Sequence, residues 1–131
     1  MVGGDRDKMN GAENIISYSD VGDDQLRSLY QSSAALLMPL TDATANNALL
    51  ESLACGLPII STDLPGTRDY LDNTESLLFK PGDVNGLVEA ALTILNDSNR
   101  RRAMAASSRA RARSLSWASI GEQTLALYQS L

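Results

Sequence analysis

The segment Pro39–Leu71 constrains the fold more than any other part of the chain. It predicts, in order, a polar loop of small residues, a short helix, a buried strand and a second polar loop, at 41–47, 46–55, 59–62 and 63–69. Gly56 is the natural residue to end the helix, because glycine adopts the left-handed conformation that often follows a helix. Pro58 then begins the strand.

The same alternation of short apolar strands and helices extends through most of the chain. Further strands are predicted at 14–18, 34–38 and 76–79, and further helices at 23–32, 84–96, 99–114 and 117–130. The continuous apolar run at 34–38 indicates a strand buried on both faces. We therefore expect 131 residues to form one α/β domain, a Rossmann-like parallel sheet with helices on both faces.

Polar residues mark several helix starts. Asp23 or Asp24 can cap the helix at 23–32, and Asp83 and Ser116 precede the helices that begin at 84 and 117. The apolar faces expected for the helices at 46–55 and 84–96 are Leu50, Leu53 and Ala54 in the first, and Val84, Leu87, Val88, Ala91, Leu92 and Leu95 in the second.

Three loops are expected at one edge of the sheet. Ligands of parallel sheets bind outside the carboxyl ends of the strands, and the loops after Tyr18, Met38 and Thr62 should all lie there. These loops are Ser19–Gly22, Thr41–Asn47 and Asp63–Asp69. We expect them to face one crevice.

The helix at 46–55 suggests a nucleotide ligand. Its first turn offers unpaired N–H groups and a positive dipole end, which suit an anion such as a diphosphate. Glu51 is the only charge between Asp42 and Asp63, and its two oxygens suit the two hydroxyls of a ribose. Glu51 can equally be a plain helix residue. Asn46 and Asn47 can be cap residues, phosphate contacts, or both.

Composition excludes several kinds of function. The formal net charge of −5 argues against a general nucleic-acid binder, and the absence of histidine removes the usual general base and most zinc sites. We expect no metal and no cofactor. Membrane association is not expected, because no apolar run reaches spanning length. The single cysteine, Cys55, is expected to be a buried, inert thiol, and it indicates a reducing, cytoplasmic location.

Basic charge gathers near the C-terminus. Residues 100–113 hold six arginines and no acid. A solvated helix face is favoured over a membrane-surface or nucleic-acid patch, because the apolar side of this helix is mostly alanine. Arg68 is expected to be a solvated cation or a partner of Asp69 or Asp72. Trp117 and Tyr128 are expected to pack.

At residues 14–131 the chain resembles a known family. The resemblance is carried by Asn14-Ile15-Ile16 with Leu29-Tyr30, by the specific core Leu50-Glu51-Ser52-Leu53-Ala54-Cys55-Gly56-Leu57-Pro58, and by Pro81-Gly82-Asp83 and Ser116-Trp117. These motifs resemble the C-terminal nucleotide-binding domain of retaining GT-B glycosyltransferases of the family 4 type. The resemblance implies the C-terminal half of a GT-B fold and, as donor substrate, a nucleotide-diphosphate sugar.

The resemblance also implies roles for individual residues. Glu51 matches the glutamate that holds the ribose, and Thr44, Asn46 and Asn47 lie in the loop and helix start that hold phosphates. Asp20 and Val21 match positions that line the base pocket. The family commonly has another glutamate, which falls on Ala43 here, with Asp42 next to it. The carboxylate that would contact the donor sugar is therefore missing or displaced to Asp42, and a plain loop carboxylate is the favoured reading of Asp42.

A further departure concerns the extent of the chain. The family's C-terminal domain begins with a strand and helix that clamp the diphosphate, and these should precede Met1. The sequence is therefore expected to be a truncated domain, inactive by itself, whose partner is an N-terminal acceptor domain or a complementing chain. Its open sheet edge makes self-association an expectation. The alternative is a non-catalytic module for nucleotide-sugar binding or assembly.

Overall fold

A parallel sheet lies at the centre of the computed structural model, which describes residues 13–43 and 46–131. Within this part of the chain the sheet has three strands in the order β1-β2-β3, at Leu36–Met38, Ile59–Thr62 and Leu77–Phe79. Leu37 pairs with Ile60, and Ser61 pairs with Leu78. All four residues of β2 are buried, as expected for the central strand.

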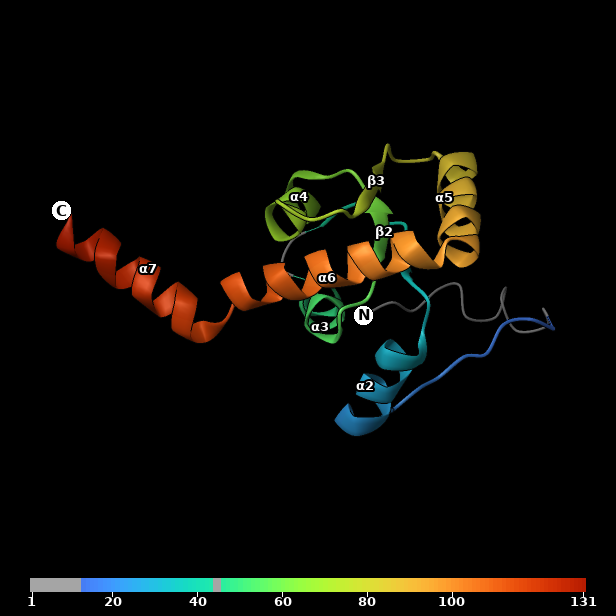
Figure 1. The fold of residues 1–131 in the computed structure, drawn as a ribbon, viewed down its shortest axis with the longest axis horizontal. Helices are drawn as coiled ribbons and strands as arrows, with labels where there is room; N and C mark the ends of the chain where they lie inside the picture. The colour runs from blue at the N-terminus through green and yellow to red at the C-terminus, as the bar shows by residue number, and fades with distance from the viewer. Residues whose placement is uncertain (1–12, 44–45) are drawn as a thin grey trace.

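Helices join the strands and cover the sheet. Helix α3 (Asn47–Cys55) connects β1 to β2, and helix α4 (Pro65–Leu71) connects β2 to β3. The remaining helices are α2 (Asp23–Ser32), α5 (Val84–Asn96), α6 (Ser98–Ser114) and α7 (Trp117–Gln129). This arrangement confirms the α/β class and the parallel sheet predicted from the sequence (Figure 1).

The core has two halves, one on each face of β2. Ile60 packs with Leu87 and Ile94 of α5 and with Met104 of α6. On the other face, Ile59 packs in a cluster with Leu49, Leu53 and Leu71, which come from α3 and α4. Successive residues of a strand point to opposite faces, so the adjacent isoleucines Ile59 and Ile60 each serve one half of the core.

Helix α6 is held to the domain by polar side chains. Arg101 donates hydrogen bonds to the carbonyl oxygens of Ile94 and Leu95, both at 2.6 Å, at the end of α5. Arg111 donates to two carbonyl oxygens in the last turn of α4, at 2.9 and 2.6 Å. Ser108 is buried and donates to Leu57. The expectation of a solvated basic face is therefore wrong for Arg101 and Arg111, which satisfy the ends of other helices.

Two predicted segments differ in the structure. Residues 14–18 form no strand, and Ile16 is exposed. A strand needs a neighbour with which to pair, and the described residues place none beside this segment. The segment predicted as a polar loop at 63–69 contains most of α4. Pro65 occupies the first turn of α4, where the N–H group that proline lacks would have no partner within the helix. The Thr67 hydroxyl accepts a hydrogen bond of 3.0 Å from the amide of Leu64.

Most predicted helix ends are confirmed. The side chains of Asn46, Asp83 and Ser116 accept hydrogen bonds from the first turns of α3, α5 and α7. Gly56 ends α3 with a φ of 70°. The cap of α2 is Gly22, so the prediction of Asp23 or Asp24 is wrong; both aspartates lie in the first turn, where the helix dipole favours them.

Several burial predictions are corrected. Leu37 of β1 is 50% exposed, so this strand is not buried on both faces. Helix α3 buries Leu49, Ser52 and Leu53 while Ala54 is exposed, and α5 buries Leu87, Ala90 and Ile94. Cys55 is half-buried.

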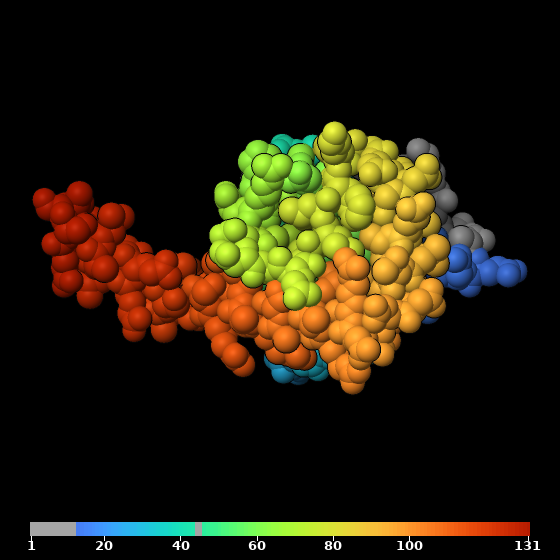
Figure 2. Space-filling model, turned by 45° about the horizontal axis from the view of Figure 1, so that its top comes forward, coloured from blue at the N-terminus to red at the C-terminus, as the bar shows by residue number. Residues whose placement is uncertain are grey.

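Helix α7 extends away from the rest of the described residues (Figures 1 and 2). It contains no buried residue. Trp117 is 93% exposed and Tyr128 is 71% exposed, so the prediction that these aromatic residues pack is wrong.

Candidate functional site

Two of the three loops predicted to share an edge lie against each other. A Cβ on Gly66, in the first turn of α4, would lie 2.2 Å from the carbonyl oxygen of Ala43. The loop after β1 therefore touches the first turn of α4, at the carboxyl ends of the strands. This is where a ligand of a parallel sheet is expected. Thr44 lies outside the described residues.

The start of α3 faces this edge. The Asn46 side-chain oxygen accepts a hydrogen bond from the amide of Leu49 at 3.3 Å, and its Nδ2 lies 3.7 Å from the sulfur of Met38. The Asn46 side chain therefore caps α3 and contacts the end of β1. The N–H groups of the first turn have no partner within the helix and point out of its N-terminus. Asn47 is the first residue of that turn, and it is exposed.

Glu51 lies one turn further along α3, with an exposed side chain. Its Oε2 accepts a hydrogen bond of 3.1 Å from the hydroxyl of Tyr30 on α2. The two helices enclose a cavity of about 240 Å³ at this point. The lining residues are Asp23, Leu26, Arg27, Tyr30, Glu51, Ala54 and Cys55. The structure thus gives Glu51 a neighbour, Tyr30, that the sequence analysis had not placed at the site.

Tyr30 keeps its proton in this environment. Burial, the hydrogen bond to Glu51 and the negative charge of Glu51 raise the pKa of Tyr30 to about 12. At neutral pH the tyrosine is a neutral donor, and the Glu51 carboxylate is its acceptor. Sequence spacing could not reveal this pair, because 21 residues separate the two side chains.

The other predicted site residues are more scattered. Asp20 is exposed with a φ of 56°, and Val21 is half-buried just before the cap of α2. Neither residue lines the cavity beside Glu51. Asp42 is exposed, and its Oδ1 accepts from the amide of Ala43 at 2.8 Å. Asp42 therefore lies at the edge where the loop after β1 meets α4.

Arg68 forms an ion pair at the same edge. Its guanidinium donates two hydrogen bonds to the Asp63 carboxylate, one from Nε to Oδ1 and one from Nη2 to Oδ2 at 2.7 Å. The predicted partners Asp69 and Asp72 are thus incorrect. Hydrogen bonding and charge from Arg68 hold the pKa of Asp63 below its usual value, so this carboxylate stays charged in mildly acidic solution.

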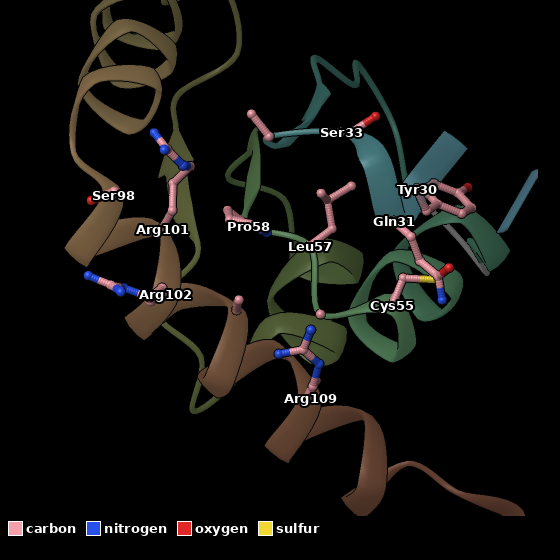
Figure 3. Close-up of a pocket in the computed structure, with 13 residues that line it drawn as sticks. Tyr30, Gln31, Ser33, Cys55, Leu57, Pro58, Ser98, Arg101, Arg102 and Arg109 are labelled. Atoms are coloured by element: carbon pink, nitrogen blue, oxygen red, sulfur yellow. The ribbon is translucent and has the colours of Figure 1, made fainter. Parts of the chain in front are cut away.

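A second cavity of about 310 Å³ lies beside the residues that precede β2 and shares Tyr30 and Cys55 with the first cavity (Figure 3). Leu57 and Pro58, which precede β2, line it together with Arg101, Arg102 and Arg109 of α6. Figure 3 shows these arginines lying apart along the helix.

The arginines of this cavity serve the fold. Arg101 is bonded to the end of α5, and Arg102 donates to Asn99. A Cβ on Gly56 would lie 2.5 Å from Cζ of Arg109, so that guanidinium covers the negative end of α3. At this cavity Arg101 and Arg109 thus lie against the ends of α5 and α3.

The described residues contain neither a metal-binding cluster nor a membrane-spanning helix. Between 13 and 43 and between 46 and 131, no three His, Cys, Asp or Glu side chains gather as a metal site would require. In the same ranges no helix has the length and apolar character needed to cross a membrane.

Comparison with known proteins finds similarity to glycosyltransferases. The family model described as glycosyl transferases group 1 matches residues 1–97. A sulfoquinovosyl transferase of Arabidopsis thaliana is 28% identical over 98 residues, which are 72% of this chain and 19% of that protein. A D-inositol 3-phosphate glycosyltransferase of Corynebacterium urealyticum is 29% identical over 109 residues, 82% of this chain and 26% of that protein. The chain thus spans about a fifth to a quarter of these relatives.

The fold has a counterpart among solved structures. Sucrose-phosphate synthase from Thermosynechococcus elongatus matches with a TM-score of 0.79 and 24% identity, over 95% of this chain and 32% of that one. The match confirms the fold that the sequence predicted, the C-terminal half of a GT-B fold.

Proposed function

We propose, from the premise that the chain belongs to the glycosyl transferases group 1 family, that it forms the nucleotide-sugar-binding half of a retaining glycosyltransferase. The donor would be a nucleotide-diphosphate sugar. The observation that carries the proposal is the position of Glu51, an exposed carboxylate beside a cavity and one turn from the N-terminus of α3.

Each part of the donor has a candidate partner. The first turn of α3 offers N–H groups and a positive dipole end to the diphosphate, with Asn47 in that turn and Asn46 as its cap. Glu51 accepts hydrogen bonds from the ribose hydroxyls. Asp20 and Val21 would contact the base, while Thr44 would help to hold the phosphates.

The chemistry would depend on positioning and charge. In the transfer, the bond from the anomeric carbon of the sugar to the diphosphate oxygen would break and a bond to an acceptor hydroxyl oxygen would form, with the hydroxyl proton passing to the leaving phosphate. Negative charge develops on that phosphate oxygen before the proton reaches it. Preorganised N–H donors at the start of α3 stabilise that charge. Asp42 lies at the same edge and is the candidate to contact the donor sugar.

The acceptor would be bound by other residues. Because this chain spans about a fifth to a quarter of its curated relatives, we assign it donor binding alone. A polypeptide of these 131 residues should bind nucleotide weakly and transfer no sugar. We place the protein in the cytoplasm, since its single cysteine fits a reducing compartment.

Titration calorimetry with UDP, GDP and ADP tests the proposal. The variant Glu51→Gln keeps the side-chain size and loses the charged acceptor, so binding should weaken by about 1.5–3 kcal/mol, roughly ten- to a hundredfold. Glu122→Gln changes an exposed glutamate on α7 and is the matched control, whose affinity should equal that of wild type.

Three results would argue against this proposal. Equal affinity in wild type and Glu51→Gln would show that the carboxylate does not bind the ribose. Turnover of a nucleotide sugar by these 131 residues, dependent on Glu51, would show that they contain a complete enzyme. Binding of another protein chain without any nucleotide affinity would favour the alternative, an assembly module.

A further inference from the structure

Tyr30 and Glu51 link two helices at the cavity. The hydroxyl of Tyr30 on α2 donates to Oε2 of Glu51 on α3 across 3.1 Å. Tyr30 is half-buried between these helices, while Glu51 is exposed. The tyrosine is therefore held by packing, and the glutamate remains reachable from solvent. Such a pair lets a half-buried side chain restrain an exposed one.

The hydrogen bond leaves most of the carboxylate available. An ionised carboxylate has two oxygens with about four acceptor positions, and a single hydroxyl hydrogen fills one of them. Oε1 and the remaining position of Oε2 can still receive the two hydroxyls of a ribose. The Tyr30 bond is thus compatible with ligand binding.

The direction of this hydrogen bond is fixed at neutral pH. The pKa of Tyr30 is raised to about 12 by burial, by the hydrogen bond to Glu51 and by the charge of Glu51. The hydroxyl therefore stays protonated and donates. Asp23, Arg27 and Cys55 line the same cavity and are unchanged in the variants below.

An exposed glutamate loses rotamer freedom when it binds a ligand, and that loss weakens binding. The geometry points to Tyr30 as a positioning residue, which orients the Glu51 carboxylate toward the ribose before the donor arrives. This inference rests on the proposed function, because it concerns the same carboxylate. It also assigns α2 a role in selecting ribose over deoxyribose.

The test compares ribonucleotides with their 2′-deoxy forms. UDP, GDP and ADP are titrated by calorimetry beside dUDP, dGDP and dADP, into wild type, Tyr30→Phe, Glu51→Gln and the double variant. Wild type should prefer the ribonucleotide about tenfold, and Tyr30→Phe should reduce this preference about three- to fivefold. In the Glu51→Gln background, Tyr30→Phe should change the preference less than about twofold.

Tyr128→Phe, at an exposed position of α7, is the matched control and should keep the wild-type preference. A preference equal to that of wild type in Tyr30→Phe would overturn the role of Tyr30 while leaving that of Glu51 intact. The absence of any ribose preference in wild type would overturn the role of Glu51 and that of Tyr30 together. A merely structural role for Tyr30 would weaken both nucleotide forms equally and would also overturn the inference.

Discussion

At the scale of single residues, Gly66 determines how closely the first turn of α4 approaches the loop after β1. The carbonyl oxygen of Ala43 lies where a side chain at Gly66 would begin. A backbone atom cannot move aside as a flexible side chain can, so Gly66→Ala must displace one of these two segments. We expect a loss of about 1–3 kcal/mol in the free energy of unfolding, measured by urea denaturation.

The control is Gly121→Ala, in the middle of α7, where the space around the new Cβ is open. Alanine is the better helix former, so this variant should be no less stable than wild type. If Gly66→Ala is as stable as Gly121→Ala, the two segments do not approach each other as closely as the structure indicates.

At the scale of elements, α6 connects parts of the domain that are distant in sequence. Its arginines reach the ends of α4 and α5, and Ser108 reaches the residue that precedes Pro58 and β2. Because the last carbonyl groups of a helix lack partners within it, these donors stabilise several helix ends from one side.

Arg111→Ala tests this role of α6. It removes the two hydrogen bonds to the last turn of α4, and Arg111 is half-buried, so the free energy of unfolding should fall by about 1–2 kcal/mol. Arg113 lies two residues further along α6 and is exposed, so Arg113→Ala should change the free energy of unfolding by less than about 0.5 kcal/mol. Equal effects of the two substitutions in urea denaturation would show that total charge, rather than these bonds, stabilises the helix.

At the scale of the whole molecule, the described residues leave apolar surface exposed on α5. Val84, Val88, Leu92 and Leu95 are all more than half exposed, and helical spacing places them on one face. The opposite face of α5 packs on the sheet. Such a stripe on a protein surface commonly marks an interface.

We expect a polypeptide of these 131 residues to self-associate through this stripe. Light scattering after size exclusion should give a mass that rises with concentration. The double variant Val88→Lys with Leu92→Lys should lower that mass, because charged side chains oppose the burial of the stripe. A monomer at every concentration in wild type would contradict the prediction.

The sequence alone determined the features that depend on neighbouring residues. Alternating apolar strands and helices predicted the parallel sheet, and local side-chain chemistry identified Asn46, Asp83 and Ser116 as caps and Gly56 as a helix end. These features could be predicted because a cap bonds within one helical turn. The same local reasoning singled out Glu51 as the candidate ribose ligand.

Only the tertiary structure decided which distant groups meet. A strand at 14–18 was predicted from its composition, yet a strand also requires a partner, and the described residues supply none. The bonds from Tyr30 to Glu51 and from Arg111 to the end of α4 span 21 and about 40 residues. Such pairs depend on how packed helices cross, which the pattern along one helix does not specify.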